Sequence, residues 1–221
     1  MSSLVPYLDR LEAGDTLAVA VRRFGIHHEG VILGIPRGGV VVAARIAERL
    51  GLDLDVIVAR KIGAPGHQEL AIGAVTADGS RYLNRALISR LGLSETYLAA
   101  ATEAAGHEAA RREALLRREH PPVDLHGRTA VVVDDGLATG ATMRAAVMAA
   151  RHRGAARVVV AVPVGAAPEC DELRHEVAGL ICPMERNDLD AIGRFYERFE
   201  SVDEEEVRRL LGASAAAAPG G

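Results

Sequence analysis

Short apolar runs rich in valine and isoleucine alternate along the chain with longer stretches that have helical character. The apolar runs predict strands at residues 31–35, 54–59, 129–133, 157–162 and 177–181. Helices are predicted at residues 39–50, 94–119 and 142–153, and two further extended segments at residues 71–75 and 81–83 around a turn. Strands that are apolar on both faces and separated by helices are typical of a parallel sheet covered on both sides.

This pattern predicts an α/β fold, a Rossmann-like parallel sheet with flanking helices in a single domain over residues 1–212. The Ala/Gly-rich residues 213–221 are expected to be disordered. Ligands of such sheets bind beyond the carboxyl ends of the strands. That rule directs attention to the segments after Ile35, Ala59, Val133 and Val162.

Composition narrows the classes of partner. The 221 residues carry a formal net charge of −4, which gives no general affinity for nucleic acid or for an anionic membrane. Apolar runs long enough to span a bilayer are missing from the sequence, and so is a secretory signal pattern. Cys170 and Cys182 have no metal-type spacing, and we expect reduced thiols in a cytoplasmic protein. The many arginines of residues 94–119 predict a solvated helix face.

Lysine occurs once in this chain. Of 26 basic residues, 25 are arginine, and the single exception is Lys61. An ammonium is a compact point charge, whereas a guanidinium is a wide planar fork. A lone lysine in an arginine-rich background therefore indicates a position where arginine would not serve.

Residues 131–142, VVVDDGLATGAT, hold the most informative pattern. Asp134 and Asp135 directly follow a buried strand, where two adjacent carboxylates are unfavourable unless hydroxyl groups or a cation satisfy them. A small-residue turn then leads into a helix at Thr142, and exposed amides at a helix N-terminus bind phosphate. The segment thus offers an acidic half for a sugar diol and an amide-rich half for a phosphate. It lacks the Gly-Lys-Ser/Thr of a Walker loop.

This segment resembles the 5-phosphoribosyl-1-pyrophosphate (PRPP) motif of the type I phosphoribosyltransferases. The resemblance implies that fold, with a small hood built from about residues 1–28 and 183–212. It also implies that Asp134 and Asp135 hold the ribose hydroxyls and that the turn holds the 5-phosphate. The implied PRPP-binding residues are Asp134, Asp135, Gly136, Leu137, Ala138, Thr139, Gly140, Ala141 and Thr142.

Two further segments complete the expected site. Arg37, Gly38 and Gly39 follow the first strand, and the resemblance assigns them, with Lys61, to pyrophosphate. The resemblance also implies a cis peptide in this loop, at Pro36-Arg37 or Arg37-Gly38. Residues 63–69 are polar and broken by Gly and Pro, which predicts a mobile lid. Within this segment His67 is expected to face solvent rather than to take part in catalysis, while Glu69 is a candidate for catalysis.

Nearly the whole chain resembles a bacterial group of phosphoribosyltransferases with no assigned acceptor. The expected activity is magnesium-dependent transfer of 5-phosphoribosyl from PRPP to a nitrogenous base, with Lys61, Arg37, Asp134, Asp135 and Glu69 as catalytic residues. Magnesium is expected on PRPP rather than in a protein cage. Family members for 6-oxopurines usually have an aspartate where this chain has Ala138, so such acceptors are disfavoured.

Other readings of the same fold stay open. One is a non-catalytic sensor of PRPP or nucleotides; another is an accessory domain that hydrolyses PRPP or binds sugar phosphates. A hydrolase elbow of the Gly-x-Ser-x-Gly type does not occur in the sequence. The expected partners are PRPP and a small acceptor, without nucleic acid or membrane, and a homodimer is among the assemblies that the sequence allows.

Overall fold

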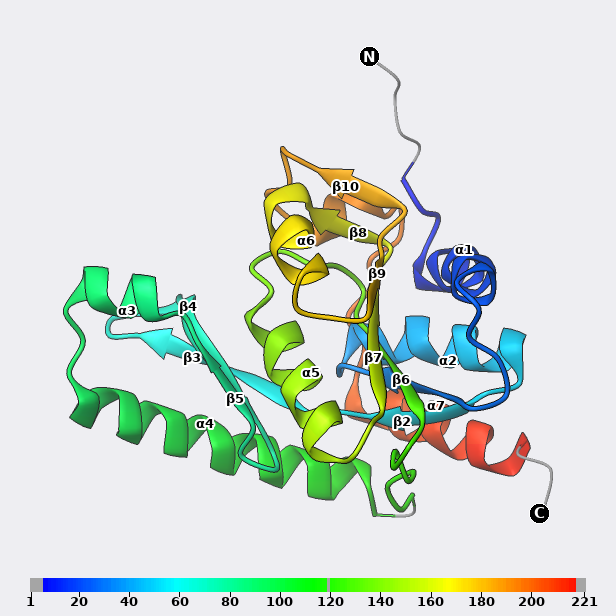
Figure 1. Ribbon diagram of the computed structural model, residues 1–221, viewed down its shortest axis with the longest axis horizontal. Helices are drawn as coiled ribbons and strands as arrows, with labels where there is room; N and C mark the ends of the chain where they lie inside the picture. The colour runs from blue at the N-terminus through cyan, green and yellow to red at the C-terminus, as the bar shows by residue number, and fades with distance from the viewer. Residues whose placement is uncertain (1–5, 119, 218–221) are drawn as a thin grey trace.

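A five-stranded parallel sheet lies at the centre of the molecule (Figure 1). The computed structural model describes residues 6–118 and 120–217. The strand order is β2-β1-β6-β7-β9, and every pairing is parallel. The strands are β1 (Gly30–Gly34), β2 (Asp53–Val56), β6 (Thr129–Val133), β7 (Arg157–Ala161) and β9 (Gly179–Ile181). The predicted fold class, a parallel sheet flanked by helices, is confirmed.

Helices cover both faces of this sheet because its strands are apolar on both sides. The helices are α1 (Arg10–Arg23), α2 (Gly38–Leu50), α5 (Ala141–His152), α6 (Ala167–Arg174) and α7 (Glu204–Ala217). Val131 and Val133 of β6 pack in one core with α1, α2 and α7. Ala130 and Val132 face the opposite way and pack in a second core with α5 and α6.

An arm leaves the sheet after β2 and projects to one side of it (Figure 1). It consists of β3 (Ala59–Ala64), β4 (His67–Thr76), β5 (Arg81–Leu83), α3 (Arg85–Leu91) and α4 (Glu95–Leu116). Ile62, Ile72 and Leu98 bury each other in a separate small core. Residues 63–69, the predicted lid, belong to the β3–β4 hairpin, whose turn is Pro65-Gly66, and such a Pro-Gly pair suits a tight turn. That this hairpin closes over the site stays a prediction.

A small cluster lies at one end of the sheet. It comprises β8 (Val164–Ala166), β10 (Met184–Arg186) and the 3₁₀ turn η1 (Ile192–Phe195), with Tyr7 and Tyr196 packed among them. The apolar side chains of α1 and α7 are instead buried in the main core with α2. A hood with the bounds expected from the sequence stays a prediction, and the name hood is used below for the cluster of β8, β10 and η1.

In the C-terminal segment, residues 213–217 differ from the prediction of disorder. Residues 213–217 continue α7 rather than being disordered, since alanine has the highest helix propensity of all residues. Residues 218–221 lie outside the described part. Among the helices of residues 6–118 and 120–217, none combines the length and apolarity that crossing a membrane requires.

Candidate functional site

The candidate site forms where β1 and β6 end side by side. Gly34 pairs with Val133 at the last register position, and the Ile35 amide donates to the Val133 carbonyl at 2.9 Å. The loop that starts at Pro36 therefore lies against Asp134 and Asp135. The sequence placed these two segments at the same edge of the sheet, and the structure brings them into contact.

Gly38 and Gly39 make this contact possible. A Cβ at Gly38 would lie 1.9 Å from Oδ2 of Asp135, and a Cβ at Gly39 would lie 2.8 Å from Cα of Asp134. No larger side chain fits either position without displacing the acidic pair. The two glycines thus let the first turn of α2 pack directly on the carboxylates.

The acidic pair is strained electrostatically. Burial and the neighbouring charge of Asp135 together hold the pKa of Asp134 well above its ordinary value. Oδ1 of Asp134 accepts a hydrogen bond from the Asp135 amide at 2.9 Å, which fixes the orientation of the first carboxyl group. Donors such as the hydroxyl groups of a sugar would satisfy the remaining oxygen atoms.

Arg10 compensates the second carboxylate. Its Nε and Nη2 both lie 2.8 Å from Oδ2 of Asp135, and only 11% of the Arg10 side chain is exposed. Its Nη1 donates to the Glu200 carbonyl at 2.7 Å, and the guanidinium stacks 3.9 Å from the ring centre of Phe199. Tyr196 donates its hydroxyl to the Asp135 carbonyl at 2.7 Å. Segments near the two ends of the described chain, residues 9–14 and 195–199, therefore meet at the acidic pair.

The peptide between Pro36 and Arg37 is cis, as expected for one of the two bonds named from the sequence. Arg37 itself is exposed at the start of α2. Its side chain has no ion pair with any side chain in the described part of the chain, so its charge is available to an anion.

The turn into α5 has the features of a phosphate site. Gly140 is the N-cap with φ +68°, and it offers no side chain to satisfy the first amides of the helix. Ala138 and Thr139 are exposed, so the turn is accessible. Leu137 is buried and anchors it to β8, donating to the Val164 carbonyl at 2.9 Å and accepting from the Ala166 amide at 2.8 Å.

A cleft of about 530 Å³ lies between this edge of the sheet and the arm. Pro36, Lys61 and Thr142 line it together, so the structure unites residues from three segments that are far apart in the sequence. The remaining lining residues come from the arm: Ala59, Arg60, Gly63, Ala64, Tyr97, Ala101 and Arg112. A larger hollow of about 670 Å³ between the end of α4 and α7 contains none of the motif residues.

His67 and Glu69, the two residues singled out in the predicted lid, both lie in β4. His67 begins β4 and its side chain is exposed. Glu69 lies in the same strand, and its side chain is outside the described part of the structure. A catalytic role for Glu69 stays a prediction.

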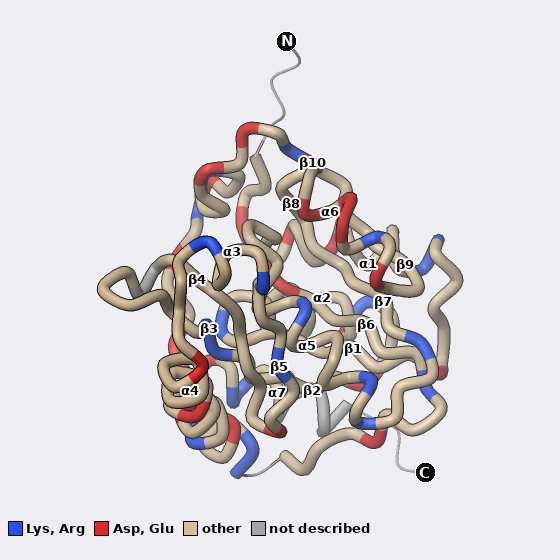
Figure 2. The backbone as a smooth tube through the Cα atoms, turned by 60° about the vertical axis from the view of Figure 1, so that its left-hand side comes forward, with Lys and Arg blue, Asp and Glu red and all other residues tan. Residues whose placement is uncertain are grey.

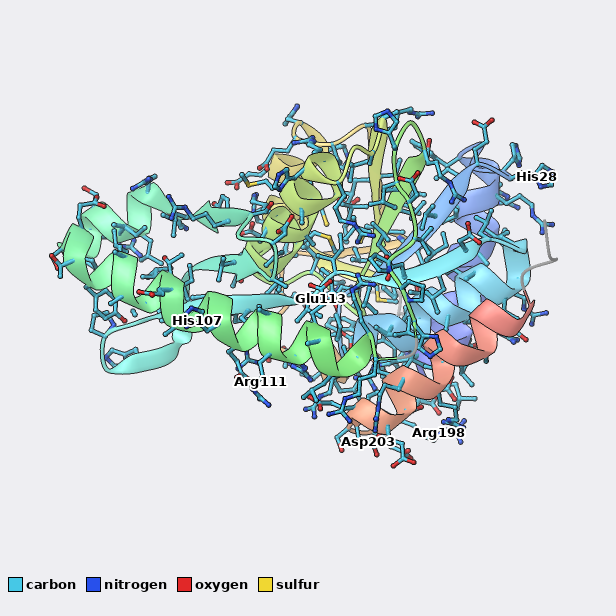
Figure 3. The ribbon with its side chains drawn as sticks, turned by 90° about the horizontal axis from the view of Figure 1, so that it is seen from below. His28, His107, Arg111, Glu113, Arg198 and Asp203 are labelled. Atoms are coloured by element: carbon cyan, nitrogen blue, oxygen red, sulfur yellow. The ribbon has the colours of Figure 1, made fainter. Side chains whose placement is uncertain are left out.

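The arginines of α4 are not one solvated face. Acidic and basic residues both occur on the helix (Figure 2), and Arg111 projects outwards (Figure 3) with a pair to Glu108 at 2.8 Å. Arg112 and Arg117, in contrast, are each only 13% exposed. Arg117 turns inward because it pairs at 2.7 Å with Asp55, a buried carboxylate that also accepts from Arg153 at 2.6 Å. Hydrophobic periodicity gave no signal for such a buried ion pair.

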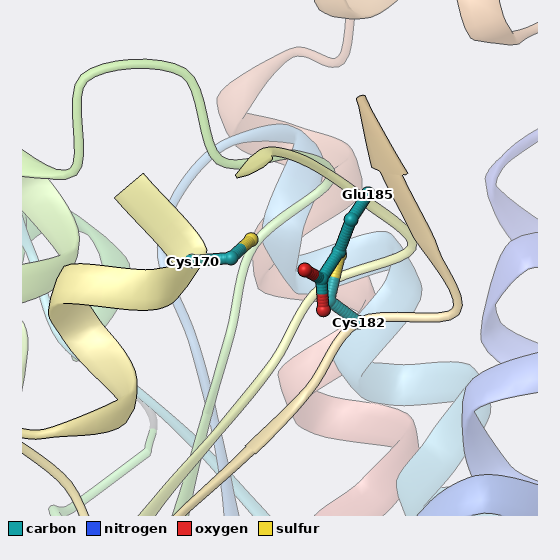
Figure 4. A group of neighbouring side chains, drawn as sticks. All are labelled: Cys170, Cys182 and Glu185. Carbon is teal, nitrogen blue, oxygen red and sulfur yellow. The ribbon is translucent and has the colours of Figure 1, made fainter. Parts of the chain in front are cut away.

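Cys170, Cys182 and Glu185 form a second cluster, under the hood (Figure 4). One potential ligand atom from each lies within 4.8 Å of the others, although the sequence spacing did not indicate a metal site. Both cysteines are free thiols, as expected. Glu185 pairs with Arg174 and the Cys182 thiol donates to the Met184 carbonyl, so protein groups already satisfy two of the three members.

Oδ2 of Asp135 is already in contact with Arg10 at 2.8 Å. That magnesium arrives on the substrate rather than in a protein cage stays a prediction. A magnesium ion that kept its bonds to polyphosphate oxygens and water would fit this edge of the sheet better.

A parallel sheet with an acidic pair, a helix N-terminus and a basic cleft at the carboxyl edge of its strands is typical of α/β proteins that bind a ligand at that edge. The model of the phosphoribosyl transferase domain matches residues 9–181, and the chain belongs to this family. The curated relatives include a protein of Mycobacterium tuberculosis H37Rv, provisionally named a phosphoribosyl transferase, which is 39% identical over 207 residues. The alignment covers 92% of this chain and 46% of that protein, so the chain spans about half the length of this relative.

Solved structures share the architecture. The crystal structure of TT1426 from Thermus thermophilus is 38% identical and superposes with a TM-score of 0.80 over 93% of this chain and 97% of that one. A hypoxanthine-guanine phosphoribosyltransferase of Bacillus anthracis gives a TM-score of 0.50 at 12% identity, over 92% of this chain and 98% of that one. The second likeness shows the fold alone. Recognition of the family from the sequence is confirmed.

Proposed function

We propose that this protein transfers the 5-phosphoribosyl group of PRPP to a nitrogen atom of a small acceptor and releases pyrophosphate. The observation that carries the proposal is that an acidic pair, an uncapped helix N-terminus and a basic cleft meet at one edge of the sheet. Gly38 and Gly39 pack on Asp134 and Asp135, and Thr142 at the start of α5 lines the cleft together with Lys61. PRPP carries phosphate groups and a ribose diol in one molecule, and these three features supply groups that bind each of them.

Each half of the site then has a defined task. Amides of Gly140, Ala141 and Thr142, with the Thr139 hydroxyl, bind the 5-phosphate. Asp134 and Asp135 accept hydrogen bonds from the ribose hydroxyl groups. Arg37, Lys61 and the backbone of Gly38 and Gly39 bind pyrophosphate.

The reaction breaks the bond from ribose C1 to the pyrophosphate oxygen, which departs with the electron pair. A bond from C1 to the acceptor nitrogen replaces it, and the acceptor loses a proton. Lys61 and Arg37 stabilise the negative charge that grows on the leaving group, while the acidic pair stabilises the positive charge on the sugar. Magnesium, carried on the oxygen atoms of PRPP, supplies further charge neutralisation when it is bound.

The acceptor is proposed to be a base other than a 6-oxopurine. Ala138 is exposed at the turn and carries no group that could exchange a proton with a purine.

Cys170 and Cys182 are free thiols, which suits the reducing cytoplasm where we place the protein. A homodimer stays a prediction that light scattering would measure.

The test is an assay of pyrophosphate release with PRPP, magnesium and a panel of acceptors that includes adenine, orotate, hypoxanthine and guanine. Release with one acceptor, lost in an Asp134→Asn/Asp135→Asn double variant, supports the proposal. Tight PRPP binding without release for any acceptor would instead support a regulator that senses PRPP. Absence of PRPP binding would refute both functions.

A further inference from the structure

Arg112 is a buried cation without a full complement of partners. It lies on α4, and its side chain is 13% exposed. Its Nε is buried and makes no hydrogen bond with the described residues. The nearest acid is Glu204 of α7, whose Oε1 lies 3.3 Å from Nε without hydrogen-bond geometry. Leaving a buried donor unsatisfied is unfavourable, so Glu204 compensates Arg112 only in part.

The surroundings of Arg112 are positively charged. Arg112 lines the same cleft as Arg60 and Lys61, and Arg37 adjoins it at Pro36. Burial lowers the pKa of Arg112; Glu204 and Glu108 oppose this, and the charges of Arg37 and Arg60 lower the pKa further. Ion pairs to Arg37, Arg60 or Lys61 are absent among the side chains that the structure describes. A cleft lined by Arg60, Lys61 and Arg112, with Arg37 next to it, is suited to an anion of high charge.

Arg112 faces this cleft for a structural reason. Tyr97, Ala101 and Arg112 all line the cleft from α4, at spacings of four and eleven residues that place them on one side of the helix. Arg111, one position earlier, points to solvent and is fully paired with Glu108. Arg111 therefore lies at the surface of α4, whereas Arg112 faces the cleft.

We propose that Arg112 is a pyrophosphate-binding residue for PRPP, supplied by the arm rather than by the sheet. The inference rests on the proposed function and adds a residue that the sequence motifs do not contain. Pyrophosphate held by Lys61 and Arg37 at the sheet edge would receive hydrogen bonds from Arg112 across the cleft. The arm would then contribute directly to substrate affinity.

The experiment compares three ligands on the whole chain by calorimetry: PRPP with magnesium, inorganic pyrophosphate with magnesium, and ribose 5-phosphate. The variant is Arg112→Gln, and the matched control is Arg111→Gln. Arg112→Gln is expected to weaken PRPP and pyrophosphate by about tenfold or more, because a hydrogen bond to a charged group is lost. Binding of ribose 5-phosphate should not change, and Arg111→Gln should bind all three ligands like the wild type.

A structural role for Arg112, through its contact with Glu204, predicts different results. In that case Glu204→Gln would weaken PRPP as much as Arg112→Gln, or Arg112→Gln would weaken ribose 5-phosphate as much as PRPP; either result overturns the inference. If Arg112→Gln binds PRPP like the wild type, the inference is also wrong while the proposed function stands. If the wild type binds neither PRPP nor ribose 5-phosphate, the proposed function itself fails.

Discussion

Replacing Arg10 with glutamine tests whether this residue compensates the acidic pair. The change removes two contacts of 2.8 Å to Asp135, the 2.7 Å bond to the Glu200 carbonyl and the stacking on Phe199. Breaking a buried ion pair costs about 3–5 kcal/mol of unfolding free energy. Because 11% and 17% of the two side chains are exposed, we expect the lower end, about 3 kcal/mol. For a domain of this size that corresponds to a fall in Tm of about 6–12 °C.

Urea unfolding of the ligand-free protein measures this loss, and calorimetry with PRPP measures its functional consequence. With Asp135 uncompensated, the two carboxylates repel each other more strongly, so PRPP should also bind more weakly. Arg198→Gln is the control, because Arg198 pairs with Asp9 at 2.9 Å but is 58% exposed, and exposed pairs contribute at most about 1 kcal/mol. Equal stabilities of Arg10→Gln and Arg198→Gln would refute the reasoning.

Three further predictions concern other carboxylates and the single lysine. Asp55→Asn should lower the unfolding free energy by about 3–5 kcal/mol in urea titrations, because Asp55 is buried and its two partners, Arg117 and Arg153, lose their counter-charge. Asp15 is more exposed, at 37%, so Asp15→Asn should cost about 1 kcal/mol or less, and equal losses would count against the argument. The pKa of Asp134 is raised in the fold, so its contribution to stability is present at low pH and is lost as pH rises through that pKa. Asp134→Asn should remove this decline of Tm with pH and should weaken the binding of PRPP. An unchanged dependence of Tm on pH would contradict the prediction. Lys61→Arg should slow pyrophosphate release by about tenfold or more, since a planar fork does not replace a point charge, and unchanged turnover would disprove the argument from the lone lysine.

The sequence predicted the elements that depend on residues close together in the chain. The strand β6 could be recognised because it is apolar on both faces. The start of α4 could be recognised from Ser94, which accepts a hydrogen bond from the Tyr97 amide at 3.2 Å. The chemistry of Asp134 and Asp135 was visible because two carboxylates after an apolar strand are unfavourable without a partner. The small residues that follow them, at positions 136–142, also predicted the turn that leads into α5.

The remaining features depend on contacts between distant parts of the chain. Arg112 and Arg117 have the same local sequence character as the exposed Arg111, and only the packing of α4 against the rest of the molecule separates them. Arg10 lies 125 residues from Asp135, and nothing near either residue indicates their pairing. The cluster of Cys170, Cys182 and Glu185 was missed for the same reason.

Binding of PRPP is the central claim, and calorimetric titration of the whole chain with PRPP and magnesium tests it most directly. We predict one site per chain, with PRPP bound at least about tenfold more tightly than ribose 5-phosphate, because Arg37 and Lys61 contact only the pyrophosphate end. Equal affinity for PRPP and ribose 5-phosphate, or binding that survives in the Asp134→Asn/Asp135→Asn double variant, would contradict the account.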